Sequence, residues 1–170
     1  MRRLRRFLDL LGKFVSDKSD SAEGLIQRAP MSRLRRRGHS HSMVPRDIPV
    51  KVFLADDSPL VRGRVAAMLG EGGINVVGQA ETPQSSIHGI LTTRPDVVVL
   101  DVQLEGGSGL QVLREVREVA PSISFVVFSN NAGDAYRKRY IGEGADRFLD
   151  KTTEFDQLVL AVTDASRHGH

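Results

Sequence analysis

Short apolar segments alternate with segments of helical character from residue 50 to residue 166. The apolar segments 96–100 and 123–128 are nearly continuous in apolar residues, which is typical of strands buried on both faces of a parallel sheet. Ser-Pro, Thr-Pro and Ser-Gly pairs that begin at residues 58, 82 and 108 mark helix starts. The pattern predicts strands over 50–55, 74–80, 96–100, 123–128 and 147–149, and helices over 58–70, 84–93, 109–119, 132–142 and 154–166.

Five strands in alternation with five helices predict an α/β fold. The expected architecture is a five-stranded parallel sheet, doubly wound, with helices on both faces. In such sheets the ligand site lies beyond the carboxyl ends of the strands, where the strand order switches. The residues that end each predicted strand are therefore the first candidates for a functional site.

Charged and hydroxyl side chains stand at four of these strand ends, namely Asp56 and Asp57, Asp101, Ser129 and Lys151. Three carboxylates that lie close together repel one another unless a divalent cation offsets their charge. Carboxylate oxygens with an open coordination position suit Mg²⁺, with Mn²⁺ as an alternative. An ammonium beside such a site can neutralise a phosphoryl group. The strand ends therefore predict a metal-dependent site that handles phosphate.

These five residues, in this order at the strand ends, resemble the site of the receiver domain of two-component response regulators. The resemblance covers about residues 50–166 and includes the surrounding sequences ADDSPLVR, PDVVVLD, SGLQVL and GADRFLDK. Each motif alone is a weak indication of this family, but the five motifs in this order, on five alternating strand–helix units, are a specific one. The resemblance implies the flavodoxin-like (βα)5 fold of the chemotaxis-type regulator.

The resemblance also implies a role for each residue of the site. Asp101 is the expected phosphoacceptor, which takes a phosphoryl group from a histidine kinase or a histidine phosphotransfer protein. Lys151 is expected to contact the phosphoryl oxygens, so that positioning and charge supply the catalysis. The expected metal site is made of Asp57, Asp101 and the backbone carbonyl of Gln103 as ligands of Mg²⁺, with Asp56 acting mostly through water bound to the metal.

Further residues are implied to respond to the phosphoryl group. The hydroxyl of Ser129 is expected to reach the new phosphoryl group while Phe148 changes rotamer. A local change of charge would thereby alter a protein-binding surface. Gln103 and Asn131 occupy positions that tune the lifetime of the phosphoryl group in the family, so substituting them is expected to change the dephosphorylation rate.

Three local features bear on the surroundings of the site. Leu104-Glu105 stands where the family often has a Met-Pro pair, which affects the expected shape of the loop and not the chemistry. Thr152 follows Lys151 where Pro or Ser is usual. The basic segment 137–139 of the fourth helix is interpreted as a solvated face, with a partner surface as the alternative.

Charge divides the chain into two parts. Residues 1–49 hold 12 Lys or Arg against 5 Asp or Glu, a net charge of +7, whereas residues 50–170 hold 12 against 16, a net charge of −4. The basic part is rich in Ser, Arg, His and Pro and is expected to be mostly disordered, with a short amphipathic helix over 4–15. Its Arg cluster over 33–37 could contact an anionic membrane or nucleic acid. Residues 167–170 form a short polar tail.

Composition excludes several classes of protein. The chain has no Cys, which excludes disulfide scaffolds, zinc fingers and iron–sulfur centres. No apolar stretch approaches the length needed to span a bilayer. We expect a cytoplasmic protein, with a peripheral position at the inner face of the membrane as the alternative.

Together these observations predict a stand-alone receiver that switches contacts with a downstream protein and is not an enzyme. We expect no DNA-binding output domain and therefore no DNA binding. A second hypothesis is a docking module that is recruited through its basic extension. A third is a Mg²⁺-dependent phosphohydrolase of the haloacid-dehalogenase type. The third is disfavoured because those enzymes place two Asp as D-x-D after the first strand, whereas Asp56 and Asp57 are adjacent.

Overall fold

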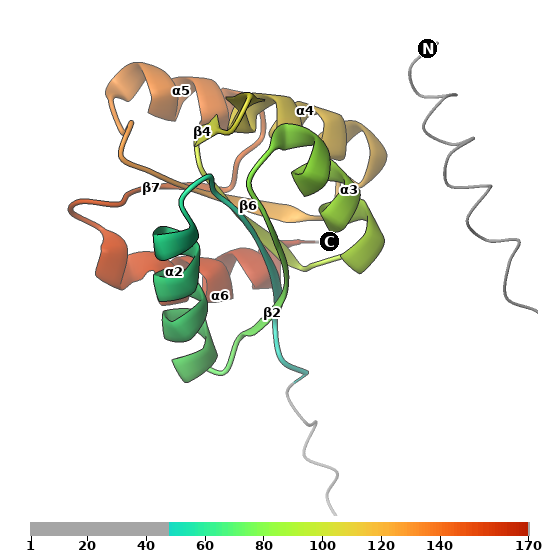
Figure 1. Ribbon diagram of the computed structural model, residues 1–170, viewed down its shortest axis with the longest axis vertical. Coiled ribbons are helices and arrows are strands. Elements are labelled where there is room, and N and C mark those ends of the chain that lie inside the picture. The colour runs from blue at the N-terminus through green and yellow to red at the C-terminus, as the bar shows by residue number, and fades with distance from the viewer. Residues whose placement is uncertain (1–47, 170) are drawn as a thin grey trace, which may run out of the picture. The chain divides into compact units, whose positions relative to one another are not determined.

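Five parallel strands form the central sheet of the structure, a computed structural model that describes residues 48–169 (Figure 1). The strand order β2-β1-β3-β6-β7 confirms the predicted five-stranded, doubly wound fold, and the order switches between β1 and β3. The predictions for residues 1–47 and 170, including the helix over 4–15, lie outside the described residues. The strands are β1 Lys51–Ala55, β2 Asn75–Ala80, β3 Val97–Leu100, β6 Ser124–Ser129 and β7 Arg147–Asp150.

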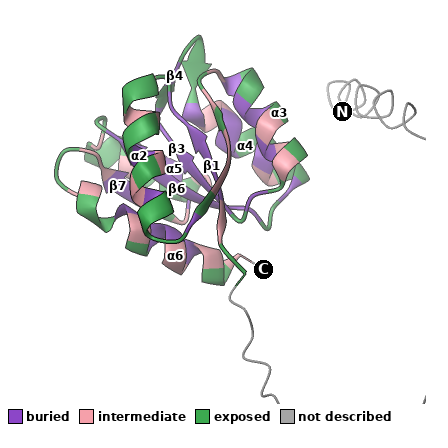
Figure 2. Ribbon diagram, turned by 60° about the horizontal axis from the view of Figure 1, so that its bottom comes forward, coloured by how far each residue is buried: buried purple, intermediate pink, exposed green. Residues whose placement is uncertain are grey.

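Helices cover both faces of this sheet (Figures 1 and 2). Side chains alternate along β1, so that Val52 and Leu54 pack toward α2 and α6 while Phe53 and Ala55 pack toward α3, α4 and α5. The sheet is therefore buried on both faces, as the continuous apolar segments predicted. The helices are α2 Pro59–Glu71, α3 Pro83–Thr93, α4 Gly109–Val119, α5 Asp134–Gly142 and α6 Leu158–His168, with the 3₁₀ helix η1 Phe155–Gln157 before α6.

Two of the three predicted helix-start signals cap their helices, whereas the Ser108 hydroxyl makes no capping hydrogen bond at the start of α4. The Ser58 hydroxyl accepts a hydrogen bond from the backbone N–H of Val61 at 3.3 Å, and Thr82 forms a capping box with Ser85. The last helix differs from its prediction, because its first turn is the separate η1 and its end is His168. Residues 167 and 168, expected in the polar tail, therefore belong to α6.

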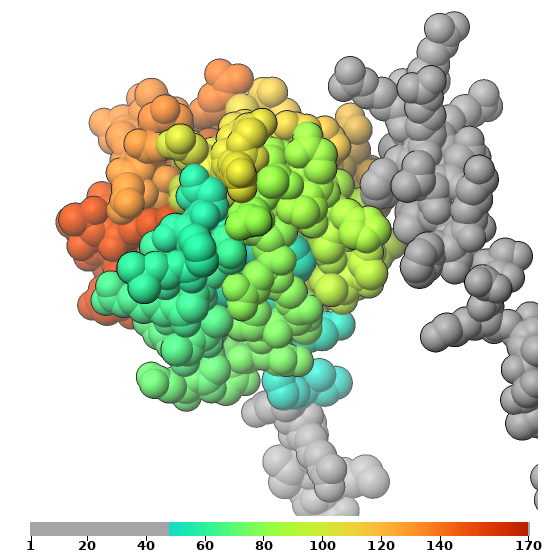
Figure 3. All heavy atoms as spheres, viewed as in Figure 1, coloured from blue at the N-terminus to red at the C-terminus, as the bar shows by residue number. Residues whose placement is uncertain are grey.

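A short hairpin that the sequence did not predict follows β3 and lies at the surface (yellow in Figure 3). Its strands are β4 Gln103–Leu104 and β5 Gly107–Ser108, which pair in antiparallel fashion. Strands of two residues are too short to produce a pattern of alternating polarity. The backbone N–H of Glu105 donates to the carbonyl of Glu81 at 2.8 Å, so the hairpin is tied to the loop after β2.

Gly109 begins α4 where two backbone segments approach closely, and we expect Gly109→Ala to lower the free energy of unfolding by about 1–3 kcal/mol. The reason is that a Cβ at this position would lie 2.0 Å from the carbonyl oxygen of Asp101. Gly63 is the matched control, because a Cβ there would meet no atom within 4 Å. Gly63→Ala should raise the free energy of unfolding by about 0.5–1 kcal/mol. Urea unfolding measures both, and equal stability of Gly109→Ala and wild type would contradict the close approach.

Candidate functional site

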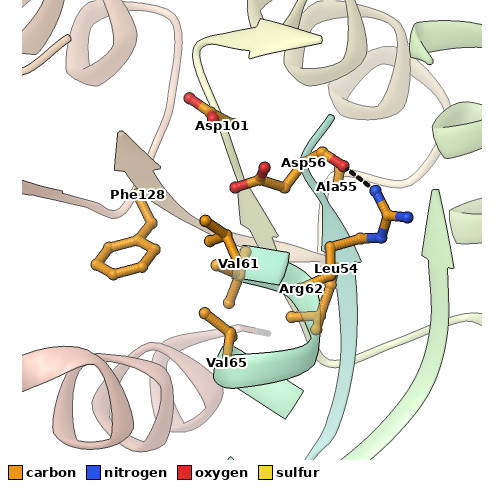
Figure 4. Close-up of a pocket in the computed structure, with 9 residues that line it drawn as sticks. Leu54, Ala55, Asp56, Val61, Arg62, Val65, Asp101 and Phe128 are labelled. Carbon is orange, nitrogen blue, oxygen red and sulfur yellow. Dashed lines mark hydrogen bonds between the residues drawn. The ribbon is translucent and has the colours of Figure 1, made fainter. Parts of the chain in front are cut away.

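Three carboxylates meet at the carboxyl ends of β1 and β3. Asp56, Asp57 and Asp101 each offer a carboxylate oxygen, and these oxygens lie within 4.8 Å of one another. Asp56 and Asp101 are buried, whereas Asp57 is exposed. Figure 4 shows the side chains of Asp56 and Asp101 after the ends of the neighbouring strands β1 and β3. The structure therefore brings together the three acidic residues that the strand ends predicted.

Lys151, directly after β7, places its ammonium between two of these carboxylates. Its Nζ donates to Oδ2 of Asp56 at 2.5 Å and to Oδ2 of Asp101 at 2.6 Å, and the lysine side chain is only 7% exposed. Burial lowers the pKa of Lys151, but the hydrogen bonds to Asp101 and Asp56 outweigh burial and leave the pKa above its ordinary value. Lys151 therefore stays protonated and neutralises part of the acidic cluster.

Asp56 is held both through its carboxylate and through its backbone. Burial raises the pKa of Asp56, and the hydrogen bonds from Lys151 and from the backbone N–H of Ser58 oppose this only in part. Arg62 of α2 donates to the backbone carbonyl of Asp56 at 2.5 Å (Figure 4). The same guanidinium pairs with Glu81 at 3.6 Å. Arg62 thus fixes the loop between β1 and α2, a role that the sequence did not indicate.

Asp101 is linked to the end of β6 through its second carboxylate oxygen. Oδ1 of Asp101 accepts a hydrogen bond from the Ser129 hydroxyl at 2.7 Å and a longer one from the backbone N–H of Gln103 at 3.3 Å. The Ser129 oxygen accepts in turn from the backbone N–H of Asn131 at 3.2 Å. Ser129 therefore already contacts Asp101 and connects it to the loop before α5.

The donor set of this cluster fits a divalent cation. Asp57 makes no hydrogen bond or ion pair with any of residues 48–169, so its oxygens are available to a ligand. Three carboxylates and one ammonium leave two negative charges at the site when all are ionised, which equals the charge that Mg²⁺ would offset. An all-oxygen set of this kind is typical of Mg²⁺.

Phe148 of β7 lies in the core beside the site. It is buried, and its ring meets that of Tyr140 edge to face, with centroids 6.0 Å apart. Gln103 and Asn131 are both exposed and flank the site on the hairpin and on the loop before α5. The structure therefore links Gln103 to Asp101 and Asn131 to Ser129 through their backbone N–H groups, whereas Phe148 packs against Tyr140 in the core.

Arg137 of α5 was interpreted as part of a solvated face, and for this residue the interpretation was wrong. Its guanidinium donates to the carbonyls of Ala132 at 3.1 Å and Phe148 at 2.9 Å, and it pairs with Glu154 at 3.0 Å. It also lies 5.2 Å from the centroid of the Phe148 ring. Glu154 accepts from the backbone N–H of Asp150 at 2.8 Å. Arg137 therefore joins the loop after β6 to the loop that carries Lys151.

Comparisons with known proteins agree with this geometry. Residues 52–163 match the family model of the response regulator receiver domain. Over 114 residues the chain is 32% identical to the response regulator GacA of Pseudomonas syringae, which covers 66% of this chain and 53% of that protein. Over 116 residues it is 32% identical to the DNA-binding transcriptional activator DevR/DosR of Mycobacterium tuberculosis, which covers 68% and 54%.

Solved structures show the same similarity. The signal receiver domain of the putative response regulator NarL from Mycobacterium tuberculosis matches with a TM-score of 0.64 and 31% identity, over 70% of this chain and 97% of that one. A LuxR-family response regulator from Aurantimonas matches with a TM-score of 0.67 and 25% identity, over 71% and 87%.

The chain belongs to the response regulator receiver domain family. Its receiver is a phosphoaccepting signalling domain of the kind that works with histidine kinases, and this sets aside the phosphohydrolase alternative. The chain spans about half the length of the curated relatives it matches. Within residues 48–169, no helix has the length and apolar character needed to cross a membrane.

The contact between Arg137 and Glu154 predicts a specific pH dependence of stability. The backbone N–H of Asp150, followed by Arg137, lowers the pKa of Glu154 below its ordinary value of 4.5. Ionised Glu154 therefore stabilises the fold above pH 4.5, and this contribution disappears as the pH falls through the lower folded-state pKa. Glu154→Gln should lower the free energy of unfolding by about 1 kcal/mol at neutral pH and by less in acid.

Urea unfolding at neutral pH and at acidic pH measures this difference. Glu118→Gln is the control, because Glu118 is an exposed carboxylate with no hydrogen bond or ion pair to any described residue. A loss for Glu154→Gln that is the same at both pH values would show that ionised Glu154 does not contribute.

Proposed function

We propose that Asp101 accepts the phosphoryl group, and that the donor is a phosphohistidine on a histidine kinase or a histidine phosphotransfer protein. One observation supports this choice among the three carboxylates. Asp101 contacts the Lys151 ammonium on one carboxylate oxygen and a side-chain hydroxyl, that of Ser129, on the other, whereas the second oxygen of Asp56 accepts from the backbone N–H of Ser58. Asp101 is thus the carboxylate that contacts both the ammonium and a side-chain hydroxyl.

The proposed reaction is an exchange of one phosphorus bond for another. A carboxylate oxygen of Asp101 attacks the phosphorus, the bond from phosphorus to the imidazole nitrogen breaks, and the electron pair returns to the imidazole. Lys151 would neutralise the phosphoryl oxygens, since its ammonium already lies against Asp101. Mg²⁺ would add positive charge at the same oxygens, with Asp57, Asp101 and the backbone carbonyl of Gln103 as its proposed protein ligands and Asp56 acting mostly through water bound to the metal.

Phosphorylation would then change the surface formed by α5 and β7. The Ser129 hydroxyl would exchange its hydrogen bond to Asp101 for one to the phosphoryl group, and the loop before α5 would follow. Phe148 of β7 contacts Tyr140 and Arg137 of α5, so a new rotamer of its ring would alter the surface that a downstream protein binds. We propose that this switching takes place in the cytoplasm, as is typical of receiver domains.

Phosphorylation by a small-molecule donor tests the assignment of Asp101. Incubation with acetyl phosphate or phosphoramidate and Mg²⁺, followed by intact mass spectrometry, should show one added phosphoryl group on the wild type and none on Asp101→Asn. Asp134→Asn is the control, because Asp134 is an exposed carboxylate at the start of α5 and should leave the yield unchanged. An adduct on Asp101→Asn, or none on the wild type, would refute the assignment.

The exposed amides of Gln103 and Asn131 are proposed to orient the water that hydrolyses the acyl phosphate. Gln103→Ala and Asn131→Ala should each lengthen the half-life of the phosphorylated protein by roughly three- to tenfold, or about 0.6–1.4 kcal/mol in activation free energy. Release of inorganic phosphate after removal of the donor gives the half-life. Gln111→Ala removes an amide on α4 that bonds only to Glu115, and it serves as the control. Unchanged half-lives in both variants would refute the proposed role of Gln103 and Asn131 in orienting the water.

A further inference from the structure

A hollow of about 380 Å³ lies between the hairpin, the start of α4 and the exposed side of α5. Leu110 forms its apolar part above the buried residues Val102 and Tyr140, and the Tyr140 hydroxyl donates to the carbonyl of Val102 at 3.3 Å. The aromatic ring of Tyr136 adds a second ring at the edge. The volume falls within the range of sites that bind small molecules in other proteins.

The charged side chain of this hollow forms no close contact with an acidic group of the fold. Arg139 lines the hollow, and its guanidinium makes no hydrogen bond or ion pair with any of residues 48–169, although its charge contributes to lowering the pKa of the Glu143 carboxyl. The neighbouring cations differ, since Arg137 pairs with Glu154 and Arg114 pairs with Glu143. An arginine that is not needed for folding contacts is available to bind a carboxylate with its planar guanidinium.

The uncharged polar groups of the hollow are available as well. Gln103 and Asn131 line it with side-chain amides that bond to no described residue, and the Ser108 hydroxyl makes no capping hydrogen bond at the start of α4. An apolar surface with a few convergent polar groups and one unpaired cation is the general design of a ligand site.

We propose that this hollow binds a small aromatic carboxylate, with the carboxylate on Arg139 and the ring against Tyr136 and Leu110. The single cation selects an anion, and the exposed ring of Tyr136 beside Leu110 favours a planar apolar body. The amides of Gln103 and Asn131 would face the bound molecule from the side nearest to Asp101. A ligand here would therefore lie against the two side chains that are proposed to set the phosphoryl lifetime. This link to regulation rests on the proposed function, whereas binding itself does not.

Binding is tested on the full, unphosphorylated chain, without Mg²⁺ or phosphodonor, so that its outcome is independent of the chemistry at Asp101. Amide chemical shifts of the ¹⁵N-labelled protein are followed by NMR during titration with phenylacetate and, separately, with its uncharged analogue phenylacetamide. Phenylacetate should shift the amides of Leu110, Tyr136 and Arg139 and saturate, while phenylacetamide should bind about three- to tenfold more weakly.

Variants of Arg139 and Tyr136 distinguish the contribution of the cation to binding from that of the aromatic surface. Arg139→Gln should weaken phenylacetate about three- to tenfold and remove the preference over phenylacetamide. Lys138→Gln is the matched control, because Lys138 is the next exposed cation on α5 and does not line the hollow. Tyr136→Ala should weaken both compounds, and the spectrum of each variant reports directly whether it is folded. The proposal is overturned by equal affinity for the two compounds, by an unchanged affinity in Arg139→Gln, or by shifts that do not map to the hollow.

Discussion

The ammonium of Lys151, held between Asp56 and Asp101, is the interaction on which the geometry of the site depends. A parallel sheet that ends in carboxylates on adjacent strands brings like charges within a few ångströms, which favours separation of those strand ends. The buried ammonium of Lys151, which follows β7, removes much of that repulsion and bridges the ends of β1 and β3 at the switch point. The same cation leaves the outermost carboxylate, Asp57, without a partner among the described residues. The Lys151 side chain therefore serves the fold, because it reduces the repulsion between carboxylates, and also the chemistry of the site, because it leaves Asp57 available to a ligand.

The sequence predicted the sheet and the acidic cluster because both follow from short-range signals. Continuous apolar strands define where each strand ends, and the parallel arrangement then requires Asp56, Asp101 and Lys151 to converge on one edge. Helix starts were predictable for a similar reason, since Ser58 and Thr82 cap their helices through contacts three residues away. These features depend on residues close together in the sequence and on the rule that the carboxyl ends of parallel strands lie at the same edge of the sheet.

Other parts of the site could not be predicted because their causes lie in tertiary contacts. The hairpin after β3 is stabilised by the loop after β2, which is distant in sequence, and its strands are too short to show a pattern. Arg137 stands beside Lys138 and Arg139, and the three residues look equivalent in a helix of low apolar content. Only the fold shows that Arg137 turns inward to three partners, that Lys138 stays exposed, and that Arg139 lines a hollow.

The contacts of Arg137 also matter for judging natural sequence variants of this protein. Distance from the acidic cluster is a common guide to the severity of a substitution, and by that measure a residue of α5 would be considered harmless. Arg137 nevertheless joins the loop after β6 to the loop that carries Lys151, so its loss would remove contacts on both sides of the site. A substitution of Arg137 would therefore act on the site from a distance, through the two loops that it joins.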